Sequence, residues 1–331
     1  MNLFPVSSSV LSSVHLATFV ATKYGFQTNT SCRLLKTGIN HTYAIDNGTE
    51  KYVFRIYSFN WRTQQEINEE IRLLLHLKHN THPVSFPIPD RSGNYIQQLA
   101  APEGTRFAVL FSHAGGEKML SFSENTHFNI GKIMAGFHKS TENFTLQRIN
   151  YTPDILLIHS LRLIKQRLSH EADEIKYMES AQAVLMATLK NADTAQLRSG
   201  VIHLDIWFDN LNINKEGQVT LFDFDFCGNG WQAIDIAYYL MQLYFLEPEK
   251  EYALKKNSFL KGYESITPIT QEEKRLLPAL GTSLYFYYLG VQCYRFENWS
   301  NTFINEVYLK RYIALRVKKQ FDLVQQNQSL V

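Results

Sequence analysis

The feature that most constrains the fold of this chain is a stretch in which apolar and polar residues alternate twice. The alternation covers residues 211–214 and 218–221, on either side of a glycine-containing turn at 215–217. This pattern predicts a β-hairpin with one buried face. If the turn centres on its last two residues, antiparallel pairing sets Asn210 opposite Asp223, with Cβ atoms about 5 Å apart.

The side chains at the open end of this hairpin suit metal and proton chemistry. An amide oxygen and a carboxylate are oxygen ligands of the kind that Mg²⁺ takes, so we expect Asn210 and Asp223 to bind this metal. Asp205 lies on the loop that enters the hairpin, and His203 precedes it by two residues. The spacing H-x-D-x-x-x-x-N is that of a kinase catalytic loop. In this interpretation Asp205 takes the proton from an attacking hydroxyl, ATP and Mg²⁺ are the cofactors, and His203 supports the loop.

The alternative is a polar hairpin with three unrelated acidic or amide residues. A lone H-x-D pair arises by chance and carries no weight. The full spacing, the hairpin and the Asp-Phe-Asp return at 223–225 together are much harder to obtain by chance.

These motifs resemble the aminoglycoside phosphotransferase/choline kinase superfamily, and within it the branch of homoserine-kinase-like and bacterial stress-response-kinase-like proteins. HLDIWFDN resembles the H-G-D-x-x-x-x-N loop, with Leu204 in place of the glycine. FDFD resembles the D-F-D/E metal site, and the segment at 234–237 resembles a D-[LI]-A motif whose aspartate, Asp235, supports the site. The resemblance implies an α+β, two-lobed protein-kinase-like fold. The N-lobe, an antiparallel sheet plus helix, is then expected at 1–112 and the mostly helical C-lobe at 113–331.

The first half of the chain fits the nucleotide-covering lobe of such a fold. Residues 32–57 read as three strands with two turns, and Gly38 and Asn40 lie in the turn where a phosphate-covering loop belongs. An ordinary hairpin turn is the alternative there. Arg55 occupies the strand position of the usual phosphate-pairing lysine, and a surface arginine is the alternative role. A helix is expected from residue 63 to 77. Its Glu70 is our choice for pairing with Arg55.

Glu69 is the second candidate for that pair, and the third, Glu66, is expected in solvent. After the strand at 107–111, Ser112 and Ala114 lie where a kinase hinge offers backbone groups to adenine. The amphipathic pattern predicts a first helix whose buried face includes Val10, Val14 and Val20, and helices at 126–139, 155–192, 234–245, 250–264, 271–299 and 303–324. Aromatic residues at 285–288 are expected in the core, with a substrate-pocket role as the alternative.

The composition excludes several partners. The formal net charge is +2 with no basic cluster, which argues against nucleic acid. No apolar run reaches the roughly 20 residues that cross a bilayer, and the first residues lack the basic region of a signal peptide. Three well-separated cysteines favour reduced thiols and a cytoplasmic protein.

The leading function is therefore ATP-dependent phosphorylation of a small-molecule hydroxyl, with the oligomeric state left open. A protein Ser/Thr kinase is one alternative, although eleven residues between Asp223 and Asp235 are too few for a long activation segment. A pseudokinase is another, motivated by Arg55. Residues 236–331 hold twelve basic and nine acidic side chains, which favours a neutral, zwitterionic or anionic acceptor over a polycation.

Overall fold

The computed structural model describes residues 4–328, which form two compact units. The first unit comprises the residues up to Gly115 together with Thr220–Phe222 and Glu297–Trp299, and the second comprises the remainder. One unit holds an antiparallel sheet and the other is mostly helical, so the α+β, kinase-like fold class is confirmed.

The first unit is built on a six-stranded antiparallel sheet. Its strands follow the order β1-β2-β3-β6-β4, and β5 also pairs with β6. The elements are α1 (Ser13–Tyr24), β1 (Ser31–Thr37), β2 (His41–Asp46), β3 (Lys51–Ile56), α2 (Gln64–His79), β4 (Pro87–Ile88), β5 (Ile96–Ala101) and β6 (Gly104–Ser112).

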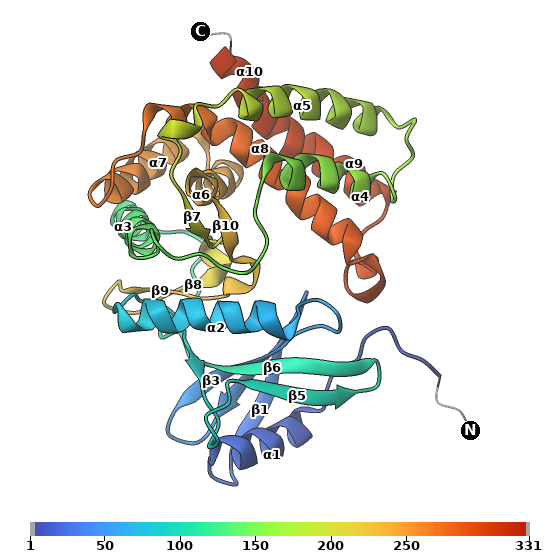
Figure 1. Ribbon diagram of the computed structural model, residues 1–331, viewed down its shortest axis with the longest axis vertical. Helices are drawn as coiled ribbons and strands as arrows, with labels where there is room; N and C mark the ends of the chain where they lie inside the picture. The colour runs from blue at the N-terminus through green and yellow to red at the C-terminus, as the bar shows by residue number, and fades with distance from the viewer. Residues whose placement is uncertain (1–3, 329–331) are drawn as a thin grey trace. The chain divides into compact units, whose positions relative to one another are not determined.

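The two helices of this unit cover opposite faces of the sheet (Figure 1). Leu16 and Val20 of α1 share a buried cluster with Phe54 of β3. Side chains alternate across a strand, so Arg55 points to the other face, where α2 supplies its ion-pair partner. The predicted first helix is correct in place but wrong in part of its face, because Val14 is 75% exposed on α1. Val10 lies before the helix begins and is also exposed.

The second unit is mainly a helical assembly. Its helices are α3 (Glu124–Ser140), α4 (Ser160–Ile164), α5 (Asp173–Lys190), α6 (Ala233–Leu246), α7 (Glu249–Glu264), α8 (Gln271–Tyr294), α9 (Glu306–Tyr312) and α10 (Lys319–Gln328), with π-helical turns at Asp154–His159 and Ile313–Lys318. Two short antiparallel pairs lie outside the large sheet: β7 (Ser199–Ile202) with β10 (Gly228–Trp231), and β8 (Leu211–Ile213) with β9 (Val219–Leu221), the last two residues of which are counted with the first unit.

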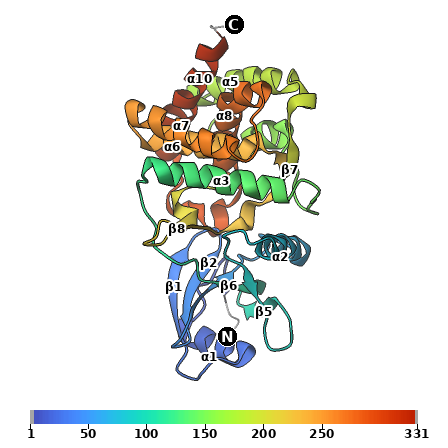
Figure 2. The ribbon, with the colours of Figure 1, turned by 90° about the vertical axis from the view of Figure 1, so that its left-hand side faces the viewer.

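Close helix packing gives this unit its frame. A Cβ atom at Gly131 of α3 would lie 2.1 Å from the Phe259 carbonyl of α7, and one at Gly262 of α7 would lie 2.0 Å from the Phe128 carbonyl. The two helices therefore meet backbone to backbone, side by side in Figure 2. The long α8 packs against α6, which carries Asp235.

Several boundaries differ from expectation. The helix expected over 271–299 ends at Tyr294, because the next residues form short 3₁₀ turns. The helix expected over 303–324 is divided into α9, a π-helical segment and α10. The β7–β10 pair was not predicted, since its strands are short and five of their eight residues are glycine or polar.

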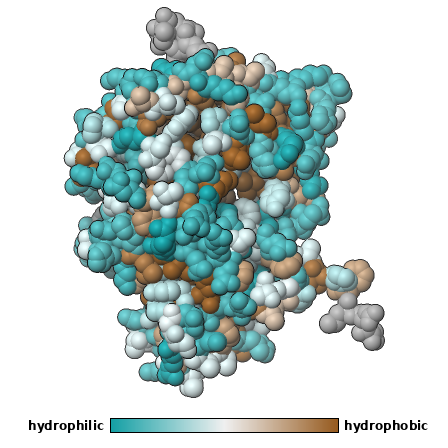
Figure 3. All heavy atoms as spheres, viewed as in Figure 1, coloured by the Kyte–Doolittle hydropathy of each residue, from teal (hydrophilic) through white to brown (hydrophobic). Residues whose placement is uncertain are grey.

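The aromatic run at 285–288 lies largely in the core of the second unit, as expected. On the face drawn in Figure 3, hydrophobic residues are interspersed among hydrophilic ones, the ordinary condition of a protein surface. None of the helices among residues 4–328 combines the length and apolar character needed to cross a membrane.

Candidate active site

The loop that carries Asp205 leaves β7 through a residue in an unusual conformation. Leu204 has φ = +70°, the left-handed region that costs a residue with a side chain about 1–2 kcal/mol. The loop is held there by the carboxylate of Asp235, which accepts the N–H groups of His203 at 2.8 Å and Leu204 at 2.6 Å. Tyr288 donates its hydroxyl to the Leu204 carbonyl at 2.6 Å. The backbone that leads into the predicted base is therefore anchored at both His203 and Leu204.

The Asp235 carboxylate is buried, with 1% of the residue exposed. Nε2 of His138 lies 3.0 Å from one of its oxygens, and Nδ1 of the same ring lies 2.7 Å from the Tyr263 hydroxyl. Three elements thus meet at this carboxylate: α3, α6 and the loop after β7. Asp235, the aspartate of the D-[LI]-A motif, therefore holds the catalytic loop against α3 and α6.

Asp205 is half-buried and both of its carboxylate oxygens accept hydrogen bonds. Tyr238 donates to Oδ1 at 2.5 Å, and the amide nitrogen of Asn210 donates to Oδ2 at 2.7 Å. The Asp205 N–H donates to Nδ1 of His203 at 3.1 Å. These contacts fix the orientation of the carboxylate, and each oxygen keeps a further lone pair for a substrate hydroxyl.

Tyr238 is a residue that the sequence reasoning missed. Burial and the neighbouring Asp205 charge raise the pKa of its hydroxyl well above the usual value, so it remains a donor. Gln242, one turn further along α6, donates to the Tyr238 hydroxyl at 3.0 Å. A signal was present, because Asp235, Tyr238 and Gln242 recur at helical spacing and lie on one face of the helix.

The hairpin is confirmed, but the predicted pairing of Asn210 with Asp223 across it is wrong. The Asn214 N–H donates to the Gln218 carbonyl at 3.0 Å, so the turn has three residues and its centre shifts by half a residue. Gly217 has φ = +76°, which permits this longer turn.

Asn210 ends a 3₁₀ turn before β8, and Asp223 lies two residues beyond β9, so neither belongs to the ladder. Both still lie at the open end of the hairpin. Because the Asn210 nitrogen donates to Asp205, its oxygen is the atom left for a cation. Together with the half-buried Asp223 carboxylate this is a hard oxygen donor set, which fits Mg²⁺ whose remaining ligands are phosphate and water. Among residues 4–328 no cluster of three or more His, Cys, Asp or Glu side chains forms a self-sufficient metal cage.

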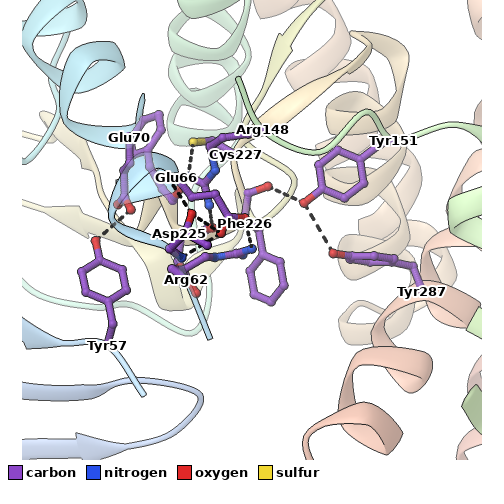
Figure 4. A network of polar contacts seen from close by, with 12 residues as sticks. Tyr57, Arg62, Glu66, Glu70, Arg148, Tyr151, Asp225, Phe226, Cys227 and Tyr287 are labelled. Carbon is purple, nitrogen blue, oxygen red and sulfur yellow. Dashed lines mark hydrogen bonds and ion pairs between the residues drawn. The ribbon is translucent and has the colours of Figure 1, made fainter. Parts of the chain in front are cut away.

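The turn that follows Asp223 is fixed by buried side chains (Figure 4). Asp223 itself has φ = +67°. Arg148 donates to the Asp225 carbonyl at 2.5 Å and contacts the Cys227 sulfur at 2.9 Å, while Tyr151 donates to the Phe226 carbonyl at 2.6 Å. Asp225 is 3% exposed, in contrast to the half-buried Asp223.

In the first unit, Arg55 forms a buried ion pair with Glu70, with 2.7 Å between Nη1 and Oε1. Tyr57 donates to the other Glu70 oxygen at 2.9 Å, as Figure 4 shows, and the guanidinium lies 4.8 Å from the centre of the Phe111 ring. Glu69 pairs instead with Arg72. The ion pair thus joins the two residues chosen from the sequence, and their role in binding nucleotide stays a prediction.

The turn with Gly38 and Asn40 connects β1 to β2. The Gly38 N–H donates to the Asn40 carbonyl at 3.0 Å, and the Asn40 side chain accepts the Ser58 N–H at 3.2 Å. A Cβ at Gly38 would meet only ordinary contacts, the nearest at 3.6 Å, so the turn does not itself require glycine.

Ser112 and Ala114 lie at and just after the end of β6. The Ser112 N–H donates to the Phe86 carbonyl at 2.8 Å, and its carbonyl accepts the Ser85 hydroxyl at 2.6 Å. The Ser112 backbone therefore serves the contacts of its own unit, and its N–H is not open to an adenine in this structure. Ala114 is buried, with 6% exposed.

Comparison with known proteins assigns the chain to a family. The phosphotransferase enzyme family (APH) matches residues 31–269, and the chain belongs to this family. An uncharacterized protein of Synechocystis sp. is 31% identical over 93% of this chain and 85% of its own length. A homoserine kinase of Sinorhizobium medicae is 29% identical over 65% of this chain and 64% of its own.

A solved structure with the same fold is the amicoumacin kinase hAmiN in complex with AMP-PNP, Ca²⁺ and Ami. Its TM-score is 0.75 at 18% identity, covering 93% of each chain. Its fold agrees with the family assignment, and the family and its kinase relatives identify the chain as a small-molecule kinase of the aminoglycoside phosphotransferase/choline kinase superfamily.

Proposed function

We propose that this protein transfers the γ-phosphoryl group of ATP to a hydroxyl of a small molecule, with Asp205 as the base. The observation that carries the proposal is the fixed carboxylate of Asp205, held on one oxygen by Tyr238 and on the other by Asn210. A base that is oriented before the substrate arrives loses little freedom in the reaction, which is how positioning lowers a barrier.

The proposed step is balanced in protons and phosphate. The hydroxyl proton of the acceptor passes to the Asp205 carboxylate as the acceptor oxygen bonds to the γ-phosphorus. The bond between that phosphorus and the bridging oxygen breaks, and ADP leaves. Arg55, oriented by Glu70, binds phosphate oxygens through its planar fork. Asn210 and Asp223 would hold Mg²⁺, which would neutralise phosphate charge when bound.

The acceptor class follows from charge and from the relatives. Beyond Asp235 the second unit carries more basic than acidic residues, a field that does not favour polycations. A relative named homoserine kinase supports a hydroxy amino acid or a compound of similar size. Use of ATP as the donor favours a cytoplasmic location.

A transfer screen with γ-labelled ATP and Mg²⁺ tests the proposal. The acceptors are homoserine, amino alcohols, sugars, kanamycin and a protein mixture, and Asp205→Asn is the control. We expect label transfer to one of the small neutral, zwitterionic or anionic hydroxyl compounds, and its loss in the variant. Transfer only to protein, or equal transfer by Asp205→Asn, would contradict the proposal. A kcat/KM for kanamycin of ~10⁴ M⁻¹s⁻¹ or more would overturn the acceptor class.

A further inference from the structure

A pocket in the second unit lies beside the loop that carries the proposed base. We call it the aromatic pocket. Its apolar wall consists of Leu120, Phe122, Trp207, Phe208, Leu243 and Leu246. Trp207 and Phe208 follow Asp205 by two and three residues on its own loop, and Leu243 and Leu246 belong to α6. The catalytic loop therefore forms one side of an apolar recess.

The pocket is also linked to the base by hydrogen bonds. Gln242 lines the pocket, and its amide nitrogen donates to the Tyr238 hydroxyl at 3.0 Å. Tyr238 in turn donates to the Asp205 carboxylate. A group bound in the pocket thus lies two hydrogen-bonded side chains from the proposed base, so a compound that fills the pocket is near Asp205.

One polar group of the pocket has no partner among the described residues. His127 is 2% exposed, and its Nε2 atom is buried without a hydrogen bond. Its other ring nitrogen, Nδ1, lies 2.7 Å from the hydroxyl of Tyr239. A buried polar group left unpaired costs about 1–3 kcal/mol, so such a group at a pocket wall calls for a hydrogen-bond partner, which a bound water or an oxygen of a ligand can supply.

The protonation of this ring follows from its surroundings. Burial, with the positive charge of Lys255 adding to it, lowers the pKa of His127 to about 4, so the ring is neutral at pH 7. If Tyr239 donates to Nδ1, one unpaired donor remains, the Nε2–H group. The opposite tautomer leaves both the Tyr239 hydrogen and the Nε2 lone pair unpaired. The first arrangement costs less, and it offers a single neutral N–H donor.

The charge at the pocket is already balanced. Glu247 is among the lining residues, and its carboxylate lies 2.7 Å from Nζ of Lys255, with side chains 14% and 8% exposed. A cationic ligand would have to compete with this ion pair for the carboxylate. An oxygen acceptor on an apolar group meets no such competition.

We propose that the aromatic pocket binds the non-reacting part of the phosphate acceptor, and that this part is an uncharged apolar group bearing a carbonyl-type oxygen bonded by His127. The proposal rests on the phosphotransfer function proposed above and adds the class of acceptor. Within the acceptor classes proposed above it favours acylated or otherwise neutral hydroxyl compounds over those with a free ammonium group, whether amino alcohols or hydroxy amino acids.

A matched series of acceptors tests this class. The probes are 3-aminopropanol, N-acetyl-3-aminopropanol and N-isobutyryl-3-aminopropanol, which share one hydroxyl and differ in charge and apolar size. We expect kcat/KM to rise along the series, by about fifteen-fold from the acetyl to the isobutyryl compound, since the two added CH₂ groups contribute about four-fold each when buried. A preference for the free amine, or equal values for all three, would overturn the proposal.

Variants connect that preference to the pocket. His127→Phe keeps the ring size and removes the donor, so the KM for the acylated acceptors should rise roughly three- to ten-fold. Leu246→Trp enlarges a lining side chain that is 47% exposed, where a larger ring need not displace the core, and should raise the same KM. Leu254→Trp, at 44% exposure outside the pocket, is the matched control. The KM for ATP should stay constant in all three, and acceptor KM values unaffected by the first two would refute the pocket assignment.

Direct binding separates this proposal from the function on which it rests. Calorimetric titration of the three alcohols into protein with AMP-PNP and Mg²⁺ needs no turnover. Tighter binding of the acylated probes, weakened by His127→Phe, supports the pocket even if no acceptor in the general screen is phosphorylated, a result that would refute only the function. Phosphorylation of other acceptors without any preference for acylated probes would refute only the pocket.

Discussion

Asp235→Asn is the substitution that most directly tests how the catalytic loop is held. The carboxylate accepts two backbone N–H groups, at 2.8 Å from His203 and 2.6 Å from Leu204, and lies 3.0 Å from Nε2 of His138. Asparagine has the same shape, but one oxygen becomes an NH₂ group. Whichever way the amide turns, a donor of the protein then faces another donor.

The magnitude follows from these contacts. A hydrogen bond to a charged acceptor contributes about 1.5–3 kcal/mol, and one to a neutral amide oxygen about 1 kcal/mol. The variant loses one charged bond and weakens another, so we expect the free energy of unfolding to fall by about 3 kcal/mol. The left-handed Leu204 then lacks part of its support, so Asp205 becomes less well positioned. We expect kcat to fall at least ten-fold, the scale of about 1.4 kcal/mol in a barrier.

Urea unfolding at constant m-value and steady-state phosphotransfer measure the two effects. Asp193→Asn is the control, because this exposed residue caps a 3₁₀ turn in the same unit through one oxygen, which asparagine keeps, and its other oxygen accepts only from the exposed side chain of Gln196. Its unfolding free energy should change by less than about 0.5 kcal/mol, within the range of surface substitutions. If the unfolding free energy of Asp235→Asn is within about 1 kcal/mol of the wild-type value and kcat is unchanged, the Asp235 carboxylate does not hold the catalytic loop in place.

The remaining predictions concern nucleotide, metal and pH. Asp205→Asn should keep Mg-ATP binding and lower kcat on the order of 10²–10⁴-fold; wild-type turnover would mean that another group is the base. Arg55→Ala should raise the KM for ATP several-fold, and Arg55→Lys should keep partial activity because the charge survives; an unchanged KM in the alanine variant excludes a phosphate contact. Asp223→Ala should weaken Mg²⁺-dependent turnover more than Asp225→Ala in a metal titration, and the reverse order would contradict the ligand assignment. Burial lowers the pKa of His41 to about 4, below about 6.5 in the unfolded chain. The unfolded chain binds the extra proton, so stability falls between pH 6.5 and 4, by about 2 kcal/mol from pH 7 to 5 for this residue. Urea unfolding at both pH values should show a smaller fall in His41→Asn.

The hairpin illustrates what a local pattern can and cannot predict. The alternation of apolar and polar residues was enough to predict β8 and β9, because this pattern depends only on residues that are neighbours along the chain. The register depended on whether the turn holds two or three residues. Gly217 at φ = +76° settled that in favour of three, and with the centre shifted by half a residue Asn210 and Asp223 are no longer equally far from the turn; the strands also end before reaching either residue.

Of the three glutamates on α2, Glu66 has a role that can be predicted from the sequence alone. Thr63 and Glu66 form a capping box, in which the hydroxyl accepts the Glu66 N–H and the Glu66 carboxylate accepts the Thr63 N–H. The T-x-x-E spacing marks that role in the sequence. It excludes Glu66 as a partner of Arg55 without any tertiary information. Helix periodicity alone could not separate Glu69 from Glu70, since the choice depends on which face of the helix lies against the sheet.

The conformation of Leu204 could not have been predicted from local preference, because leucine rarely adopts a positive φ. It is imposed from a distance, by a carboxylate 31 residues later on α6 and by a tyrosine hydroxyl on α8. The same helix face of α6 supplies Tyr238, which holds the base itself. One face of one helix therefore sets both the backbone beneath Asp205 and the orientation of its carboxylate. A substitution that rotated or shifted α6 would therefore disturb the proposed base without changing Asp205 itself. Leu204→Gly, which restores the glycine of the H-G-D motif, would remove the backbone strain, but the loop would still need the hydrogen bonds from Asp235.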